Sequence, residues 1–364
     1  MEVPARKAIL RGMAGSDSLV NEGAFSGLAP PEPSSREREF ENTLRPGSFA
    51  EFVGQSRTIG NLRVALDAAR QRGEALEHVL LSGPPGLGKT SLARILGAEL
   101  GVAVHSTSGP ALERPRDLVG ILTQLGERHV LFVDEVHRIP ASVEEYLYSA
   151  MEDFVVDFTL DQGPNARVLP LPLARFTFIG ATTREGLLSA PFRNRFGLLE
   201  RLTPYPVEDL VRILERSGRI LSVPATAEAL HAIAERARGT PRIANRFLRR
   251  VRDLAQVQGV ERIDATLAID ALSRIGVDQN GLEELDRRIL GYLASQGSAP
   301  VGLKTIAAAV GESEDTLEEV YEPHLLRSGF LQKTSRGRQI TRQGKRAIGW
   351  TGSERGASGD RLFG

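Results

Sequence analysis

The chain has 364 residues, which is long for a single hydrophobic core and predicts two or three domains. Its 46 basic and 46 acidic side chains cancel, so any contact with nucleic acid has to come from local clusters of charge. The lack of cysteine excludes disulfides and thiolate chemistry, and without a secretory signal or a long apolar run we expect a cytoplasmic protein with no membrane span.

Both ends of the chain have the composition of mobile segments. Residues 1–42 are rich in Gly, Ser, Pro and Glu and hold too few apolar side chains to bury a face. Residues 351–364 are polar and rich in glycine. We therefore expect an N-terminal extension, ordered structure from about Leu44, and a C-terminal tail after Trp350.

Residues 43–204 alternate short β-branched runs with helical periodicity, which is typical of a parallel sheet flanked by helices. The apparent strands cover 78–83, 102–107, 129–134 and 176–183, and amphipathic helices cover 90–100 and 142–154. Residues 154–173 alternate apolar and polar side chains around a Gly-Pro turn. This pattern predicts a β-hairpin inserted into an α/β domain.

The strand patterns stop after Tyr205, and two smaller domains are predicted to follow. Residues 205–276 read as an all-helical domain, with helical patterns over 207–220, 227–237, 241–257 and 266–275. Residues 277–350 give three short helices and a terminal hairpin, which is the layout of a winged-helix domain.

The strongest single motif is GPPGLGKT at residues 83–90, between an apolar strand and a helical pattern. Its glycines let backbone N–H groups surround phosphates, and the positive end of the following helix faces the same anion. Lys89 would reach the β and γ phosphates, Thr90 would bind Mg²⁺, and Ser91 would add a phosphate contact. This motif predicts a site for ATP or GTP.

A second motif tests whether the nucleotide is hydrolysed. Asp134 and Glu135 follow an apolar run, at the strand end where open α/β sheets bind ligands. Asp134 would hold Mg²⁺ and Glu135 would orient and deprotonate water, although such a pair can also simply cap a strand. Thr183 ends the next strand, where it is either a sensor of the γ phosphate or a helix cap.

Together these motifs resemble the RuvB family of AAA+ ATPases. The likeness runs from about residue 44 to 350 and rests on GPPGLGKTSLA, LFVDEVHRI, GATTREGLLSAPFRNRFG, RGTPRIANRFLRRVRD and SGFLQKTSRGR. It implies a homo-hexameric ring around duplex DNA that uses ATP to move four-way Holliday junctions in recombination and repair. It also implies a RuvA-like junction-binding partner and a RuvC-like resolvase.

The resemblance further implies a nucleotide site built from several segments. Leu44 and Arg45 would flank the adenine, Tyr205 and Arg242 would approach from the small domain, and Arg195 would be an arginine finger that completes the neighbouring subunit's site. The full implied set around the nucleotide is Leu44, Arg45, Gly86, Lys89, Thr90, Ser91, Glu152, Asp153, Phe154, Tyr205 and Arg242.

Two further surfaces follow from the same resemblance. Phe158 and Leu160 of the hairpin would dock on the RuvA-like partner, whereas strand alternation alone allows them to face the core. Residues 324–346 hold basic side chains and no acid, so we expect Lys333, Arg336 and Arg338 of the wing to contact DNA phosphates. Glu314 stands where the family often has a basic residue, and a proline precedes Tyr205.

Two other functions remain open at this point. A nucleotide-controlled DNA-binding switch, like archaeal origin-recognition proteins, also joins AAA+ and winged-helix domains and would turn ATP over slowly. A clamp-loader subunit would leave the basic wing without a role. The inserted hairpin at 154–173 favours the motor.

Overall fold

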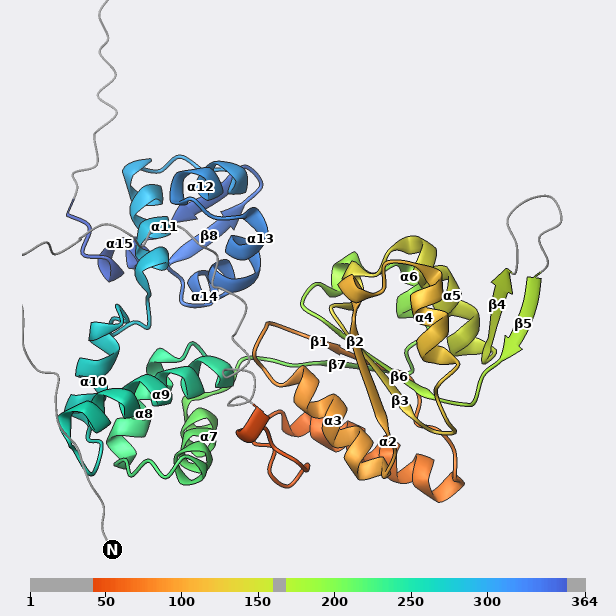
Figure 1. The fold of residues 1–364 in the computed structure, drawn as a ribbon. Helices are drawn as coiled ribbons and strands as arrows, with labels where there is room; N and C mark the ends of the chain where they lie inside the picture. The colour runs from red at the N-terminus through yellow and green to blue at the C-terminus, as the bar shows by residue number, and fades with distance from the viewer. Residues whose placement is uncertain (1–41, 160–167, 352–364) are drawn as a thin grey trace, which may run out of the picture.

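The computed structural model describes residues 42–159 and 168–351 (Figure 1). The predicted extension at 1–42 and the tail at 351–364 therefore lie almost wholly outside the described residues, as does the turn of the inserted hairpin. None of the helices in the described ranges is long and apolar enough to cross a membrane.

A parallel five-stranded sheet forms the first domain. Its strands lie in the order β2 (Val104–Ser108), β3 (Val130–Asp134), β6 (Thr177–Thr182), β1 (Val79–Ser82) and β7 (Leu198–Arg201). All adjacent pairs run in the same direction, so the loops that follow β1, β3 and β6 meet at one edge of the sheet. The predicted α/β architecture is confirmed.

Strand alternation divides the core of this domain between the two faces of the sheet. Leu81, Phe132 and Ile179 pack on the face covered by α2 (Ser56–Arg72) and α3 (Lys89–Leu100). Leu80 and Val133 face the opposite layer, which consists of α4 (Pro115–Leu122), α5 (Ala141–Glu152) and α6 (Ala190–Arg193). Because buried parallel strands need apolar side chains on both faces, their sequences read as continuous apolar runs.

The fifth strand, β7, was not predicted from the sequence, and one buried acid explains why. Glu200 lies inside this edge strand at 4% exposure, where it accepts hydrogen bonds from Thr58 Oγ1 and Asn61 Nδ2 of α2, each at 2.8 Å. Strand β7 therefore lacks the apolar pattern of its neighbours, and the burial of Glu200 depends on hydrogen bonds from a helix far away in the sequence.

The predicted hairpin is present as a separate two-stranded sheet. β4 (Val155–Thr159) pairs antiparallel with β5 (Val168–Pro172), so that Phe158 lies opposite Leu169. The hairpin projects from the end of α5, away from the other two domains (Figure 1). Leu160 lies outside the described residues.

Four helices form the second domain, and each begins and ends close to the residues predicted from the sequence. They are α7 (Val207–Ile220), α8 (Ala227–Arg236), α9 (Pro241–Gln258) and α10 (Ala265–Arg274). Their starts follow ordinary capping rules: the Thr226 hydroxyl accepts from Ala229 N, the Asp264 carboxylate accepts from Leu267 N, and Pro241 occupies the first turn of α9.

The third domain is a winged helix. It contains α11 (Glu284–Ser295), α12 (Leu303–Val310), α13 (Glu314–Thr316), α14 (Glu322–Arg327) and α15 (Arg342–Ala347), with the wing formed by β8 (Leu331–Thr334) and β9 (Gly337–Ile340). The third predicted helix is interrupted, because a π-helical turn at Leu317–Tyr321 separates α13 from α14. The last helix, α15, was not predicted.

A buried ion pair joins the second and third domains. Arg238, after α8, donates to Asp286 of α11 through Nη2 at 2.5 Å and to the Gly281 carbonyl through Nε at 2.8 Å. Asp286 is fully buried. Because separating such a pair would leave a charge without compensation in the interior, the two domains are firmly connected here.

Candidate functional site

The loop between β1 and α3 forms a cradle of backbone at the edge of the sheet. Gly83, Gly86 and Gly88 have φ angles of 134°, 78° and 105°, which favour glycine. A Cβ on Gly83 would lie 2.5 Å from the Leu202 carbonyl oxygen, so a side chain does not fit. Helix α3 starts at Lys89 and is twelve residues long, so its positive end faces the loop. Buried Ser91 lies in its first turn.

The side chain of Lys89 lies against the carbonyl groups of this loop. Its ammonium donates to the Gly83 carbonyl at 2.7 Å and to the Pro84 carbonyl at 2.9 Å, and the side chain is buried. Burial lowers the pKa of Lys89 to about 8, against the opposing effect of the negative charge of Asp134. The ammonium of Lys89 is therefore a buried cation that can bind an anion in the loop.

The tip of β3 brings two oxygen ligands together. Thr90 Oγ1 donates to Asp134 Oδ2 at 3.3 Å, while Asp134 Oδ1 accepts from Glu135 N at 2.9 Å. Hydroxyl and carboxylate oxygens are the donors that Mg²⁺ prefers, usually together with phosphate oxygens and water. Among the residues that the structure describes, no three His, Cys, Asp or Glu side chains are grouped to hold a metal. The pair therefore fits Mg²⁺ that is bound together with a nucleotide.

An unusual backbone conformation at Glu135 sets the position of its side chain. Its φ is 52°, and its carbonyl oxygen would lie 2.3 Å from a Cβ on Gly109, so Gly109 allows the turn to form. The Glu135 carboxylate accepts from Arg138 Nη1 at 3.0 Å and is 43% exposed, so it is open to water. A carboxylate held beside the Asp134 strand tip can orient and accept a proton from water.

The tip of β6 carries a chain of hydrogen bonds that the sequence did not reveal. Thr182 Oγ1 lies 3.0 Å from His137 Nδ1 and accepts from Arg184 N at 3.0 Å. Burial lowers the pKa of His137, which favours the neutral ring as the partner of this hydroxyl. Next to it, Thr183 Oγ1 donates to Glu319 of the winged-helix domain at 3.3 Å.

Two predicted residues of the second domain do reach the loop. The Tyr205 hydroxyl donates to the Leu87 carbonyl at 3.1 Å, and Arg242 N donates to the Gly86 carbonyl at 3.4 Å. The positive charge of Arg242 contributes to the lowered pKa of Lys89 after the larger effect of burial. Tyr205 and Arg242 are thus brought together with the phosphate loop.

Leu44 and Arg45 are held by a residue that sequence reasoning missed. Arg216 of α7 donates to the Leu44 carbonyl at 2.7 Å and to the Arg45 carbonyl at 3.2 Å, and it pairs with Glu51 at 2.9 Å. The second domain therefore positions the segment expected beside the adenine. An arginine on a polar helix face gives no signal of such a contact.

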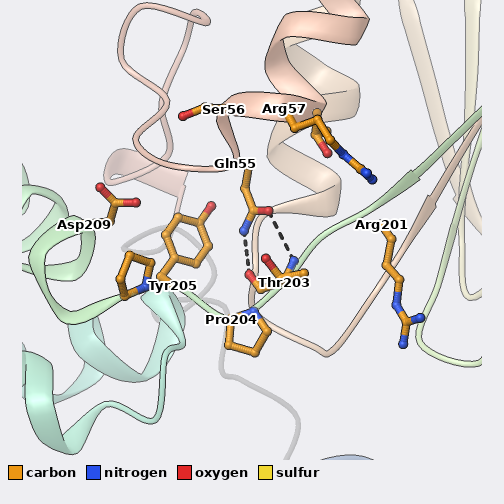
Figure 2. Close-up of a pocket in the computed structure, with 10 residues that line it drawn as sticks. Gln55, Ser56, Arg57, Arg201, Thr203, Pro204, Tyr205 and Asp209 are labelled. Carbon is orange, nitrogen blue, oxygen red and sulfur yellow. Dashed lines mark hydrogen bonds between the residues drawn. The ribbon is translucent and has the colours of Figure 1, made fainter.

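A cavity of about 390 Å³ lies between the start of α2 and the connection from β7 to α7. Figure 2 shows Gln55 in two hydrogen bonds with Thr203: Gln55 Nε2 donates to the Thr203 carbonyl at 2.6 Å, and Thr203 N donates to Gln55 Oε1 at 3.2 Å. Tyr205 borders the same cavity. Gln55 thus fastens the start of α2 to the linker between the domains.

Arg195 lies at the opposite end of the sheet from Lys89. It donates to Glu152 Oε2 at 3.0 Å and to the Pro191 carbonyl at 2.8 Å, and its guanidinium lies 4.3 Å from the centre of the Tyr148 ring. Its partner Glu152 ends α5, close to His78, which directly precedes β1 and lies 2.9 Å from the Met151 carbonyl.

Asp153 and Phe154 accompany Glu152 at that end, where the Phe154 and His78 rings lie 6.2 Å apart. The four residues of β1 separate them from the phosphate loop by about 13 Å. The structure therefore does not bring Glu152, Asp153, Phe154 or Arg195 to the loop of their own chain.

The three predicted DNA contacts in the wing differ in their surroundings. Arg336 is exposed beside the turn, and Lys333 is 52% exposed with its ammonium 3.3 Å from Glu318. Arg338 is only 12% exposed and donates through Nε and Nη2 to both oxygens of Glu322, at 2.9 Å and 3.0 Å. The guanidinium of Arg338 is therefore paired with an acid inside the domain, a contact that the sequence did not predict.

Family models match almost all of the described chain. They are the Holliday junction DNA helicase RuvB P-loop domain at residues 44–202, the RuvB AAA lid domain at 205–278, and the RuvB C-terminal winged helix domain at 279–349.

Individual relatives agree with these models. The chain is 57% identical to the Holliday junction branch migration complex subunit RuvB of Myxococcus xanthus, covering 83% of this chain and 88% of that protein, and 53% identical to that of Flavobacterium psychrophilum, covering 86% and 92%. A solved structure, the Thermotoga maritima RuvB Holliday junction branch migration motor, is 44% identical with a TM-score of 0.78, covering 85% of this chain and 100% of that one.

Proposed function

We propose that this chain, which belongs to the RuvB family, is the ATP-hydrolysing subunit of a motor that moves Holliday junctions along DNA. The observation that carries the proposal is the convergence of Lys89, the Thr90–Asp134 pair and Glu135 at one edge of the sheet. Each supplies one requirement of phosphoryl transfer: a cation, a metal site and a base.

Binding of ATP would begin with an exchange of partners at Lys89. The ammonium gives up the Gly83 and Pro84 carbonyls for the β and γ phosphates, and the N–H groups of the loop surround the same oxygens. Tyr205 and Arg242 close the site from the second domain. Mg²⁺ bound by Thr90 and Asp134 would offset the phosphate charge.

Hydrolysis then needs a correctly placed water. Glu135 accepts its proton, and Thr183 donates to the γ phosphate or to the water once its hydroxyl leaves Glu319. His137 positions Thr182, so that the tips of β3 and β6 keep a fixed separation. These steps require no movement of the sheet.

The arginine finger is a group that the chain does not supply to its own phosphate loop. Arg195, with Glu152, Asp153 and Phe154, lies at the far end of the sheet, so we assign this surface to the nucleotide of a neighbouring copy. A ring of identical subunits meets this need at every interface, and we propose a homo-hexamer. The arginine would stabilise charge in the transition state.

The other surfaces fit contacts outside the ring. Lys333 and Arg336 of the wing would grip duplex phosphates without regard to sequence, as a translocating motor requires. The hairpin of β4 and β5, with Phe158 and Leu160, would dock a RuvA-like protein, and a RuvC-like resolvase would act on the same junction. We place the complex in the cytoplasm, where its proposed substrates, ATP and chromosomal DNA, occur in bacteria.

A branch-migration assay tests this function. A labelled synthetic four-way junction is incubated with the chain, Mg²⁺ and ATP, with and without a RuvA-like protein, and the Lys89→Ala variant serves as the control. We expect ATP-dependent conversion of the junction to two duplexes, and none with the variant. Tight ATP-dependent DNA binding without conversion or turnover would instead identify a nucleotide-controlled switch.

A further inference from the structure

One short acidic segment connects the winged-helix domain to the ATPase domain at the tip of β6. Arg184 pairs with Glu319 at 2.7 Å, with Asp315 at 2.8 Å and with Glu318 at 3.8 Å. Glu319 also accepts the hydrogen bond from Thr183. The sensor threonine and its neighbour are therefore both occupied by one carboxylate from another domain.

A proline sets the geometry of this segment. In a regular α-helix, Pro323 would lose its hydrogen bond and press its ring against the carbonyl of Glu319, four residues earlier. The chain instead forms the π-helical turn Leu317–Tyr321 directly before α14. Leu317 is buried in the domain core, while the acids that follow it reach out to Arg184.

Glu319 lies in the electric field of the phosphate site. A cavity of about 680 Å³ is lined by Gly83, Pro84, Thr183, Arg184 and Glu319. Burial lowers the pKa of Lys89 most, and the negative charge of Glu319 is among the groups that oppose this shift. The carboxylate of Glu319 thus interacts with the same cation that would bind a γ phosphate.

We propose that Glu319 is a latch that ATP opens: its carboxylate holds Thr183 and Arg184 while no γ phosphate is present, and a γ phosphate displaces it and frees the winged-helix domain. The inference rests on the proposed nucleotide site and adds a regulator to it. Displacement follows because two anions beside Lys89 repel each other, and because Thr183 cannot donate one proton to both. ADP lacks the displacing group and leaves the latch closed.

The latch also reaches the wing. Glu318 lies 3.8 Å from Arg184 and accepts from Lys333 at 3.3 Å, so the same segment lies against the sensor and partly neutralises a DNA contact. When the latch opens, Glu318 loses Arg184 and pairs with Lys333 alone, so Lys333 becomes harder to transfer to a DNA phosphate. By linkage, a DNA phosphate bound at Lys333 in turn weakens ATP binding by the same factor.

Removal of one charge tests the latch. In the full-length chain, Glu319→Gln is compared with Glu314→Gln, which removes the same charge from exposed α13, and the affinities for ATPγS and ADP with Mg²⁺ are measured by calorimetry. We expect Glu319→Gln to bind ATPγS at least about fivefold more tightly than wild type, with ADP affinity unchanged. Equal ATPγS affinities in the two variants would overturn the latch. If the wild-type chain binds no ATPγS, the nucleotide site itself is refuted.

A distance measurement provides a readout that does not depend on affinity. The chain has no cysteine, so spin labels can be attached at Leu187→Cys beside the cavity and Val320→Cys in the π-helical turn, both exposed positions. We expect the distance between the labels to increase with ATPγS and to stay unchanged with ADP. The same increase should appear without nucleotide in Glu319→Gln. A distance that ATPγS leaves unchanged at saturation would contradict the proposal.

Discussion

The affinity of this chain for ATP should fall as the pH rises above 8, because Lys89 must carry its proton to bind phosphate. Burial lowers the pKa of Lys89 to about 8 in the free site. Bound phosphates hold the proton more tightly and raise that pKa. Full affinity is therefore present below the pKa of the free site and is lost as the pH rises through it.

The size of the effect follows from the pKa of the free site. With a pKa of about 8, Lys89 is mostly charged at pH 7 and mostly neutral at pH 9, so the affinity should decrease about tenfold at pH 9 and tenfold again at pH 10. One pKa unit corresponds to about 1.4 kcal/mol. The last phosphate ionisation, near pH 6, is complete in this range, and burial raises the pKa of Tyr205 beyond it.

Calorimetric titration of ATPγS between pH 7 and 10 measures this dependence, and at pH 9 two buffers of different ionisation enthalpy reveal the uptake of a proton. The Lys89→Arg variant is the matched control, because a guanidinium keeps its charge in this range. Its affinity should not vary with pH. A constant wild-type affinity, or an equal decrease in Lys89→Arg, would refute the assignment of this titration to Lys89.

Five substitutions separate the remaining roles. Lys89→Ala should lose ATP binding, because Lys89 holds the phosphates. Glu135→Gln should bind ATP but release no inorganic phosphate, because Glu135 accepts the proton of the attacking water. Normal ATP turnover by Glu135→Gln would exclude Glu135 as the base. Arg195→Ala should bind ATP normally yet hydrolyse it on the order of 10³-fold more slowly, and mixed rings with Lys89→Ala subunits should regain activity. If rings shown to be mixed stay inactive, Arg195 does not act between subunits. Lys333→Ala should reduce the salt dependence of DNA binding by about one ion. Arg338→Ala should lower the free energy of unfolding by about 1–3 kcal/mol, because it removes the two hydrogen bonds to buried Glu322 and leaves that acid with the Lys333 ammonium at 3.9 Å. An unfolding curve that stays unchanged in Arg338→Ala would exclude that structural role.

Elements with a repeated local pattern could be predicted from the sequence. The helices of the second domain follow apolar spacings of three and four residues, and three of the four predicted strands, β1, β3 and β6, are buried with apolar side chains on both faces. The phosphate loop could be located because its glycines, Lys89 and Thr90 are adjacent in sequence and each has a defined chemical role. These elements could be predicted because their geometry is determined by residues that lie close together in the sequence.

What the sequence could not provide depends on contacts between distant segments. Strand β7 contains Glu200, whose burial is compensated by hydrogen bonds from Thr58 and Asn61 of α2. The π-helical turn needs both Pro323 and a domain for its acids to contact. The sequence around Arg216 and Glu319 is typical of a surface helix, and only the fold places them against Leu44 and Thr183.

The balance of charge suits a protein that must hold DNA and then release it. The cations of residues 324–346 would give a strong, permanent grip if they were all free, yet Lys333 and Arg338 lie against Glu318 and Glu322. A DNA phosphate that bound Lys333 would therefore have to replace an internal acid, which would lower the affinity by the strength of that pair. Because the same acidic segment contacts Arg184 at the tip of β6, the nucleotide state can set how much that replacement costs. A neutral chain with paired cations can alternate between grip and release, whereas a chain with a large excess of free positive charge would stay bound.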